Sequence, residues 1–382
     1  MTGQEYPREP PMTAITFSDQ IHAAIRSTAP GYMQATHQDF AQFDMSRGEA
    51  RFTWPAEVLA AMPDPRGEDL RYQDPRGSAA LREAFLAHRA IRSQPGLDPR
   101  QLLVTAGAKQ ALWLAFAVAV RAGDRILLPC PGWAPYRIWA GAFGARASFY
   151  DPSPLHADAL LAEIAARNCD HVVINSPHNP TGAEYDQAII DRIAAAAAAA
   201  GVTVISDEVY RDLGRDRASF LAHIGTPGGV MVADSLSKTA GAAGLRIGFL
   251  AGPADVVDAA LAVRATIDSC PPGTGQAIAT FLLSPAAAPL RHGIRQFAQA
   301  SVARLAEKLR ALGTPAESSG ALYLWVPASG DGDCVALGDG MLARGVAGRT
   351  FGLGGHVRLC PVDSDERIAR LLGVAFEPGG EA

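Results

Sequence analysis

The chain contains only three lysines, and this scarcity makes each of them a candidate for amine chemistry. Of its 34 basic residues, 31 are arginine, and the lysines are Lys109, Lys238 and Lys308. A surface charge can be either residue type, but a nucleophilic amine cannot be an arginine, because the guanidinium stays protonated. Covalent amine chemistry in this chain therefore requires one of these three side chains.

Lys238 lies in a segment whose composition suits a phosphate beside a reactive amine. The string DSLSKTAGAAGLRIG follows a predicted strand and gathers Ser235, Ser237, Lys238 and Arg246 in one Gly/Ala-rich turn. Hydroxyl and guanidinium groups are good phosphate donors. Taken alone, the pattern is equally compatible with a solvated loop that carries ordinary charges.

Three further predicted strand ends favour the ligand-binding interpretation. Asp207 follows one strand, and a buried carboxylate there needs a cation, such as a protonated ring nitrogen. Asn179, in SPHNPTG, follows another and offers two donors and one acceptor. After a third, the Gly107 turn begins a helix whose free amides at Ala108 and Lys109 can hold an anion. Four strand ends thus predict one anionic ligand that bears a nitrogen and a carbonyl.

Alternating strands and helices must position these groups. Short apolar runs bounded by Gly, Pro or Asp predict strands at 101–105, 124–128, 171–175, 202–206 and 230–234, the last four of them buried and parallel. Helices are expected at 109–120 and 185–200, the second ending in seven alanines followed by Gly201. The alternation predicts a doubly wound α/β sheet, in which ligands bind at the carboxyl ends of the strands.

Both ends of the chain predict a second, smaller α+β domain. It would contain a mixed N-terminal arm at 17–43, a long helix at 290–312 and a strand in GALYLWV at 320–326. The expected division is 1–47 for the arm and part of the small domain, 48–289 for the large ligand-binding domain and 290–382 for the rest of the small domain.

Composition excludes several classes of function. The 382 residues carry a net charge of −5 with no dominant basic cluster, which argues against nucleic acid or an anionic membrane as partner. Five scattered cysteines without a CxxC spacing favour reduced thiols and no metal site. Neither a signal peptide nor an apolar run long enough to span a bilayer is found, so a cytoplasmic protein is expected.

The chain resembles a known enzyme family over nearly its whole length. It is similar to pyridoxal-phosphate enzymes of fold type I, specifically the class I and II aminotransferases related to aspartate aminotransferase. Any one matching string could be chance, but eight in the family's order are highly specific. They are SRGEARFTWP, YQDPRGSAALREAF, VTAGAKQAL, PCPGWAPY, NSPHNPTG, SDEVY, SLSKTAGAAGLRIG and HVRL.

The resemblance implies a pyridoxal 5'-phosphate site. Lys238 would form the Schiff base with the cofactor and shuttle the substrate proton, while Asp207 would keep the pyridine nitrogen protonated. Asn179 and Tyr210 would hydrogen-bond the phenolic oxygen of the ring. The phosphate would be held by Gly107, Ala108, Lys109, Ser235, Ser237 and Arg246, with Tyr72 reaching the phosphate of the neighbouring subunit.

The resemblance also implies a substrate side of the same site. Trp133 would stack on the cofactor and, with Asn179, contact the substrate; the alternative is an ordinary core tryptophan. Arg358 would pair with the substrate α-carboxylate and Gly48 would let the backbone approach it; the alternative for Arg358 is a charge on a surface strand. The Lys109 side chain points either to an acidic substrate or to solvent.

The expected activity is ping-pong transfer of an amino group from an α-amino acid to an α-keto acid, in a homodimer with shared active sites. Elimination, replacement or cyclisation of an amino acid on the same cofactor is the alternative, because the 345–352 loop is shorter than is common in the family. A cofactor-binding transcription regulator lacks support, since no DNA-binding domain precedes Gly48, and no GxGxxG motif favours a dehydrogenase. The sequence does not specify the donor or the acceptor.

Overall fold

A seven-stranded sheet forms the centre of the computed structural model, which describes residues 43–64, 71–89, 97–316, 321–328 and 332–374. Across the sheet the strands run β2 (Leu102–Thr105), β8 (Gly248–Ala251), β7 (Val230–Ser235), β6 (Thr203–Asp207), β5 (His171–Asn175), β3 (Arg125–Pro129) and β4 (Arg146–Tyr150). All neighbours are parallel except β8, which is antiparallel to both β2 and β7. The fold is therefore the doubly wound, mostly parallel α/β sheet that the sequence predicts.

The five strands predicted in the large sheet agree with the observed ones to within one residue at each end, and the four expected to be parallel pair in that way. The strand predicted in GALYLWV at 320–326 is observed later, at Leu324–Pro327. Two strands of the large sheet were missed. The edge strand β4 has four exposed residues of five in the described chain, so its sequence RASFY lacks the apolar run of a buried strand. The strand β8 lies in GFLA, directly after the Gly/Ala-rich turn that carries Lys238.

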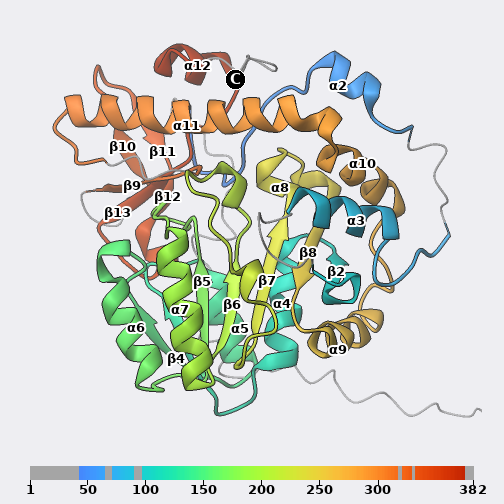
Figure 1. The fold of residues 1–382 in the computed structure, drawn as a ribbon. Helices are drawn as coiled ribbons and strands as arrows, with labels where there is room; N and C mark the ends of the chain where they lie inside the picture. The colour runs from blue at the N-terminus through green and yellow to red at the C-terminus, as the bar shows by residue number, and fades with distance from the viewer. Residues whose placement is uncertain (1–42, 65–70, 90–96, 317–320, 329–331, 375–382) are drawn as a thin grey trace, which may run out of the picture.

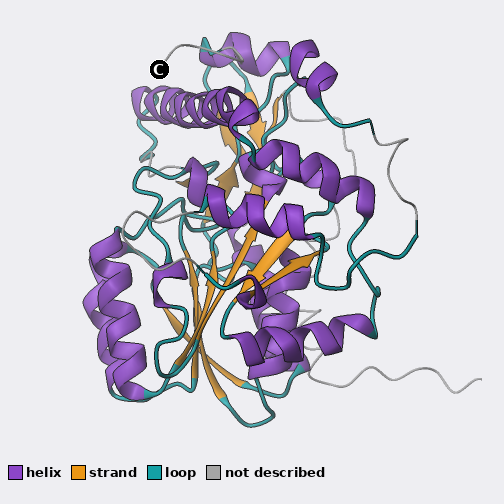
Figure 2. Cartoon of the chain, turned by 45° about the vertical axis from the view of Figure 1, so that its right-hand side comes forward, coloured by secondary structure: helices purple, strands orange, loops and turns teal. Residues whose placement is uncertain are grey.

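Helices cover both faces of this sheet (Figure 2). One face packs against α4 (Ala108–Ala119), α5 (Ala134–Ala142) and α9 (Ala254–Ala265). The other packs against α3 (Ala79–His88), α6 (Ala157–Ala165), α7 (Gln187–Ala200) and α10 (Gly273–Leu283). Alternate residues of each strand enter the two cores: Val230 and Val232 of β7 face the second set of helices, and Met231 and Ala233 face the first.

Helix boundaries follow local capping chemistry. The Asp186 carboxylate accepts a hydrogen bond from the amide of Ile189 at the start of α7, and Gly201 ends this helix in the left-handed conformation, with φ +66°. Gly107 begins α4 with φ +82°, a conformation that favours glycine. The alanine-rich helix and both of its predicted ends are thus observed within two residues.

Two three-stranded sheets bring distant parts of the sequence together above the large sheet (Figure 1). The first has the order β1 (Phe43–Asp44), β11 (Leu342–Arg344), β10 (Cys334–Ala336), and the second β12 (Val346–Ala347), β13 (His356–Leu359), β9 (Leu324–Pro327). The long helix α11 (Ala288–Ala311) runs across them. The predicted arm at 17–43 lies outside the described residues except for Phe43, and the division into domains at residues 47 and 289 stays a prediction.

The remaining elements are short. They include the helices α2 (Ala56–Ala61), α8 (Leu236–Thr239) and α12 (Glu366–Leu372). Single 3-10 turns occur at η2 (Pro99–Gln101), η3 (Pro154–His156), η4 (Arg211–Leu213), η5 (Phe220–His223), η6 (Ala243–Leu245), η7 (Pro285–Ala287) and η8 (Gly348–Phe351). Among the described helices, none combines the length and the apolar character needed to cross a bilayer.

Candidate functional site

A cavity of about 440 Å³ opens at the carboxyl ends of β5, β6 and β7. These ends lie level, because the parallel register sets Asn175 beside Asp207 and Asp207 beside Ala233. The chain passes to opposite sides after β3 and β5, so the cavity lies near a switch point of the sheet, where α/β proteins bind ligands. Its lining includes Gly48, Ala108, Lys109, Trp133, Asn179, Asp207, Tyr210, Ser235, Ser237, Lys238, Arg246 and Arg358.

Lys238 reaches this cavity from the short helix α8. Its Nζ donates a hydrogen bond to the carbonyl oxygen of Gly48 at 2.5 Å. Burial lowers the pKa of the Lys238 amine, and the nearby Glu49 carboxylate opposes this shift. A lowered pKa raises the fraction of neutral amine near neutral pH, which is the form that attacks a carbonyl carbon.

Asp207 is the last residue of β6 and lines the cavity. It is buried, which is unusual for a carboxylate. Burial raises its pKa to about 6, while a hydrogen bond from Tyr136 lowers it in part. The Tyr136 hydroxyl donates to Oδ2 at 2.5 Å, and the amide of Val209 donates to Oδ1 at 3.3 Å. No cationic side chain of the described residues forms an ion pair with this carboxylate. A protonated nitrogen on a ligand in the cavity would supply the missing positive charge.

The cavity lining also contains a group of hydrogen-bond donors, here called the cradle, formed by Ser235, Ser237, Arg246 and the start of α4. Ser235 caps α8, with its Oγ accepting from the Ser237 amide at 3.0 Å and lying 2.8 Å from the Ser237 Oγ. Arg246 donates to the carbonyl oxygen of Ala106 at 3.1 Å, beside the start of α4. A Cβ on Gly107 would lie 2.5 Å from the Arg246 guanidinium. Two hydroxyls, a guanidinium and a helix-start amide form a set that fits a phosphate group.

Arg358 forms the wall nearest the small sheets, and its guanidinium is held between two aromatic rings. Its Cζ lies 4.6 Å from the ring centre of Tyr323 and 5.2 Å from that of Phe351. The guanidinium donates to the Asn179 side-chain oxygen at 3.1 Å and to the Ser46 carbonyl oxygen at 2.7 Å. Within the described chain its buried Nε has no hydrogen-bond partner, so the guanidinium can still donate a hydrogen bond to a bound carboxylate.

Gly48 and Trp133 complete the surroundings. A Cβ on Gly48 would lie 2.8 Å from the Tyr323 hydroxyl, so only glycine fits between that ring and Lys238 without a shift. Trp133 packs edge-on against Tyr136, with ring centres 5.3 Å apart, and lines the cavity while also packing against the neighbouring core. The Lys109 Nζ lies 5.6 Å from the centre of the Trp133 ring.

The structure therefore brings the predicted residues to one place, with two qualifications. Gly107 supports the cavity through its turn rather than lining it, and Tyr72 lies outside it with 87% of its surface exposed. Three polar lining residues were missed, namely Tyr136, Asn175 and Tyr323, as were the apolar lining residues Leu112, Val209 and Ala243. Tyr136 ends the string PCPGWAPY and Tyr323 lies in the predicted strand GALYLWV, but only their contacts with Asp207 and with Tyr210 reveal their position.

A mostly parallel sheet with an amine, a buried carboxylate and a phosphate-type cradle at its strand ends defines the class of fold type I aminotransferases. The family model for aminotransferases of class I and II matches residues 41–374, and the chain belongs to this family. The members of this family use pyridoxal phosphate. The chain is therefore an enzyme that transfers amino groups.

Individual relatives agree with this assignment. The chain is 30% identical to the aspartate/prephenate aminotransferase of Thermus thermophilus over 353 residues, which are 87% of this chain and 91% of the relative. A double mutant of the Thermus thermophilus aspartate aminotransferase superposes with a TM-score of 0.76 at 25% identity, covering 94% of this chain and 96% of that chain. For N-succinyldiaminopimelate aminotransferase from Mycobacterium tuberculosis the TM-score is 0.75 at 25% identity, covering 86% and 91%. These names do not favour elimination, replacement or cyclisation.

Proposed function

We propose that the cavity binds pyridoxal 5'-phosphate covalently through Lys238, and that the chain moves an amino group from an α-amino acid to an α-keto acid in two half-reactions. The observation that supports this most directly is that Lys238, the Asp207 carboxylate and the cradle of Ser235, Ser237 and Arg246 all line one cavity. The carboxylate would pair with the ring nitrogen of the cofactor, the cradle would hold its phosphate, and the amine would condense with its aldehyde.

Each side chain of the site has a separate role in the reaction. When bound, the pyridinium ring supplies the electron sink for the pair of electrons released at the substrate Cα. Asp207 holds the proton on the ring nitrogen, and Tyr210 and Asn179 donate to the phenolic oxygen. Lys238 Nζ would accept the proton from the substrate Cα and would donate it again to complete the half-reaction.

Arg358 and Gly48 position the substrate. The guanidinium, fixed by Asn179 and by two aromatic rings, receives the α-carboxylate through two parallel hydrogen bonds, while Gly48 leaves room beside it. This clamp directs the Cα–H bond toward Lys238, and so favours its cleavage over that of the other bonds at Cα. Trp133 covers the face of the ring and contacts the substrate.

The active unit is a homodimer with shared sites, located in the cytoplasm. Tyr72 carries a large aromatic surface that is exposed in the single chain, as expected for a residue that reaches the phosphate in the partner subunit. The other partners are the small-molecule amino acid and keto acid. The Lys109 side chain, beside Trp133, is the candidate contact for a substrate with a second carboxylate.

The test is chemical trapping of the cofactor on its lysine. Borohydride reduction of the purified protein, followed by digestion and mass spectrometry, should place the label on the peptide that contains Lys238. Lys238→Ala should remove the label and the visible absorbance, and the matched control Lys308→Ala, in α11, should keep both. A colourless wild-type protein supplied with the cofactor, or a label on the peptide of Lys109 or Lys308, would contradict the proposal.

A further inference from the structure

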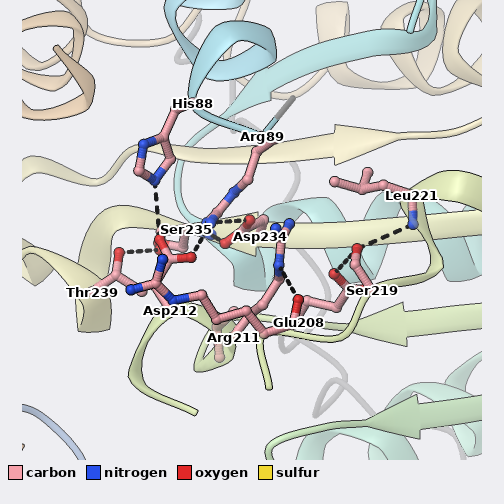
Figure 3. A network of polar contacts seen from close by, with 12 residues as sticks. His88, Arg89, Glu208, Arg211, Asp212, Ser219, Leu221, Asp234, Ser235 and Thr239 are labelled. Carbon is pink, nitrogen blue, oxygen red and sulfur yellow. Dashed lines mark hydrogen bonds and ion pairs between the residues drawn. The ribbon is translucent and has the colours of Figure 1, made fainter. Parts of the chain in front are cut away.

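A buried arginine at the end of α3 pairs with two carboxylates, one of which directly precedes the cavity-lining Ser235 (Figure 3). The Arg89 side chain is 3% exposed and pairs with Asp212 and with Asp234 Oδ2, the latter at 2.6 Å. His88 approaches the same Asp212 carboxylate, with its Nε2 3.1 Å from Oδ2. Figure 3 shows these side chains converging from α3, from η4 and from the end of β7.

The sequence places this arginine where an apolar residue would be expected. Leu81, Phe85 and Arg89 follow one another at four-residue spacing, which is the stripe by which α3 packs into the core. Phe85 stacks on Phe249 of β8 with ring centres 4.1 Å apart. Burying a charge carries a large desolvation cost, and an apolar side chain of similar size often replaces a buried ion pair without loss of stability. Packing alone therefore gives no reason for an arginine here.

The contacts of Asp234 supply such a reason. Asp234 directly precedes Ser235, and its Oδ1 accepts the Ser235 amide at 2.6 Å. Ser235 in turn caps α8 through the amide of Ser237, and the Thr239 hydroxyl donates to the Ser235 carbonyl oxygen at 3.4 Å. The first residue of the turn that carries Lys238 is thus hydrogen-bonded to a carboxylate that forms an ion pair with Arg89.

The ionisable side chains around Arg89 also act on this turn through their charges. The acids are Glu208, Asp212 and Asp234, and the arginines are Arg89 and Arg211. Burial raises the pKa of Asp234, and Arg89 opposes that shift by stabilising the ionised form. Without Arg89, a carboxylate next to the serines of the phosphate cradle would lose its main counter-charge and repel an anion bound there.

We propose that Arg89 is a positioning residue of the aminotransferase site: by holding Asp234 it fixes the β7–α8 turn and neutralises the carboxylate behind the phosphate-binding serines. The inference rests on the proposed function, because it assigns Arg89 a part in retaining the cofactor phosphate. Arg89 contacts neither cofactor nor substrate, and acts through Asp234 and Ser235.

The test compares Arg89→Met with Arg89→Met/Asp234→Asn in the pyridoxal-phosphate-loaded enzyme. Loss of bound cofactor, followed by its absorbance after gel filtration, should be at least about tenfold faster in Arg89→Met, because the buried Asp234 carboxylate beside Ser235 loses its main counter-charge, whereas Asp212 keeps His88. The double variant removes the charge of Asp234 and should return the rate most of the way to wild type. Arg89→Lys keeps a charge but not the planar fork, so an intermediate rate is expected if Arg89→Met does not fold.

Two controls separate this role from general stability. Leu309→Ala creates a cavity in α11 and should lower the unfolding temperature without changing the rate of cofactor loss. An unchanged rate in folded Arg89→Met or Arg89→Lys, or an equal increase in Leu309→Ala, would overturn the inference.

A second measurement does not depend on the covalent cofactor. Inorganic phosphate should raise the unfolding temperature of the cofactor-free wild type and do so less in Arg89→Met, with recovery in the double variant. If the wild type forms no bond at Lys238 but shows this pattern, the proposed covalent site fails, while the support that Arg89 gives to the phosphate-binding serines through Asp234 stands. Equal stabilisation of wild type and Arg89→Met by phosphate would overturn the inference while leaving the covalent site in place.

Discussion

Tyr136→Phe should change the acidity of Asp207 while leaving the packing of the cavity wall almost unaltered. The hydroxyl of Tyr136 donates to Asp207 Oδ2 at 2.5 Å, and both side chains are buried. The substitution removes one oxygen atom and keeps the ring, so that the main effect is the loss of a hydrogen bond to the ionised carboxylate. Burial already raises the pKa of Asp207 to about 6, and the loss should raise it further.

The size of this effect follows from the strength of the bond. A hydrogen bond to a charged group contributes about 1.5–3 kcal/mol, and one pKa unit corresponds to about 1.4 kcal/mol, so the pKa should rise by about 1–2 units. In the folded, cofactor-free variant Asp207 should then ionise near pH 7–8 instead of about 6. The substitution therefore moves the ionisation midpoint of Asp207 toward neutral pH, where the pH dependence of stability can report it.

The direction of the pH dependence is fixed by linkage. The pKa of Asp207 is higher in the folded chain than the value of about 3.9 expected in the unfolded chain, so Asp207 lowers stability as pH rises between these two values. Above the folded pKa this penalty is complete. In Tyr136→Phe the decline should therefore continue to about pH 7–8, with an additional loss of about 1.5–3 kcal/mol above it.

Urea unfolding of both cofactor-free proteins between pH 5 and pH 9 measures the difference, in which the contributions of other buried acids cancel. Tyr150→Phe is the matched control, because its buried hydroxyl donates to the Val173 carbonyl oxygen and not to Asp207. It should shift stability by a constant amount at every pH. A difference between Tyr136→Phe and wild type that is equally independent of pH would refute the assigned link between this hydroxyl and the acidity of Asp207.

Three other substitutions probe separate parts of the enzyme. Arg358→Leu should lower kcat/KM for amino acids at least about thirtyfold, because losing a buried hydrogen-bonded ion pair costs about 2–5 kcal/mol; unchanged kinetics would exclude the carboxylate clamp. Gly107→Ala should weaken cofactor affinity roughly tenfold in an equilibrium titration, since its φ is +82° and its Cβ would meet Arg246. Leu305→Ala should lower the free energy of unfolding by about 2–5 kcal/mol in urea, while the same titration gives the wild-type affinity.

Local sequence patterns predicted the elements of the large sheet well, because their causes are local. A buried parallel strand needs a short apolar run, and a helix end needs a residue such as Gly201 that adopts the left-handed conformation. The edge strand β4 escaped prediction for the same reason: its exposed residues carry no apolar signal, and its pairing with β3 is what makes it a strand. The antiparallel direction of β8 likewise depends on its neighbours.

By itself, the sequence determined that polar groups would follow apolar strands at four places. The small number of lysines left three candidates for amine chemistry, and the serines and the arginine near Lys238 favoured that one. Which further side chains join them was decided by the tertiary structure. Tyr323 meets Tyr210 across 113 residues, Arg358 meets Asn179 across 179, and Arg89 reaches Asp234 of β7 from the end of α3. Such contacts depend on how whole elements pack against one another, and no short window of residues encodes that packing.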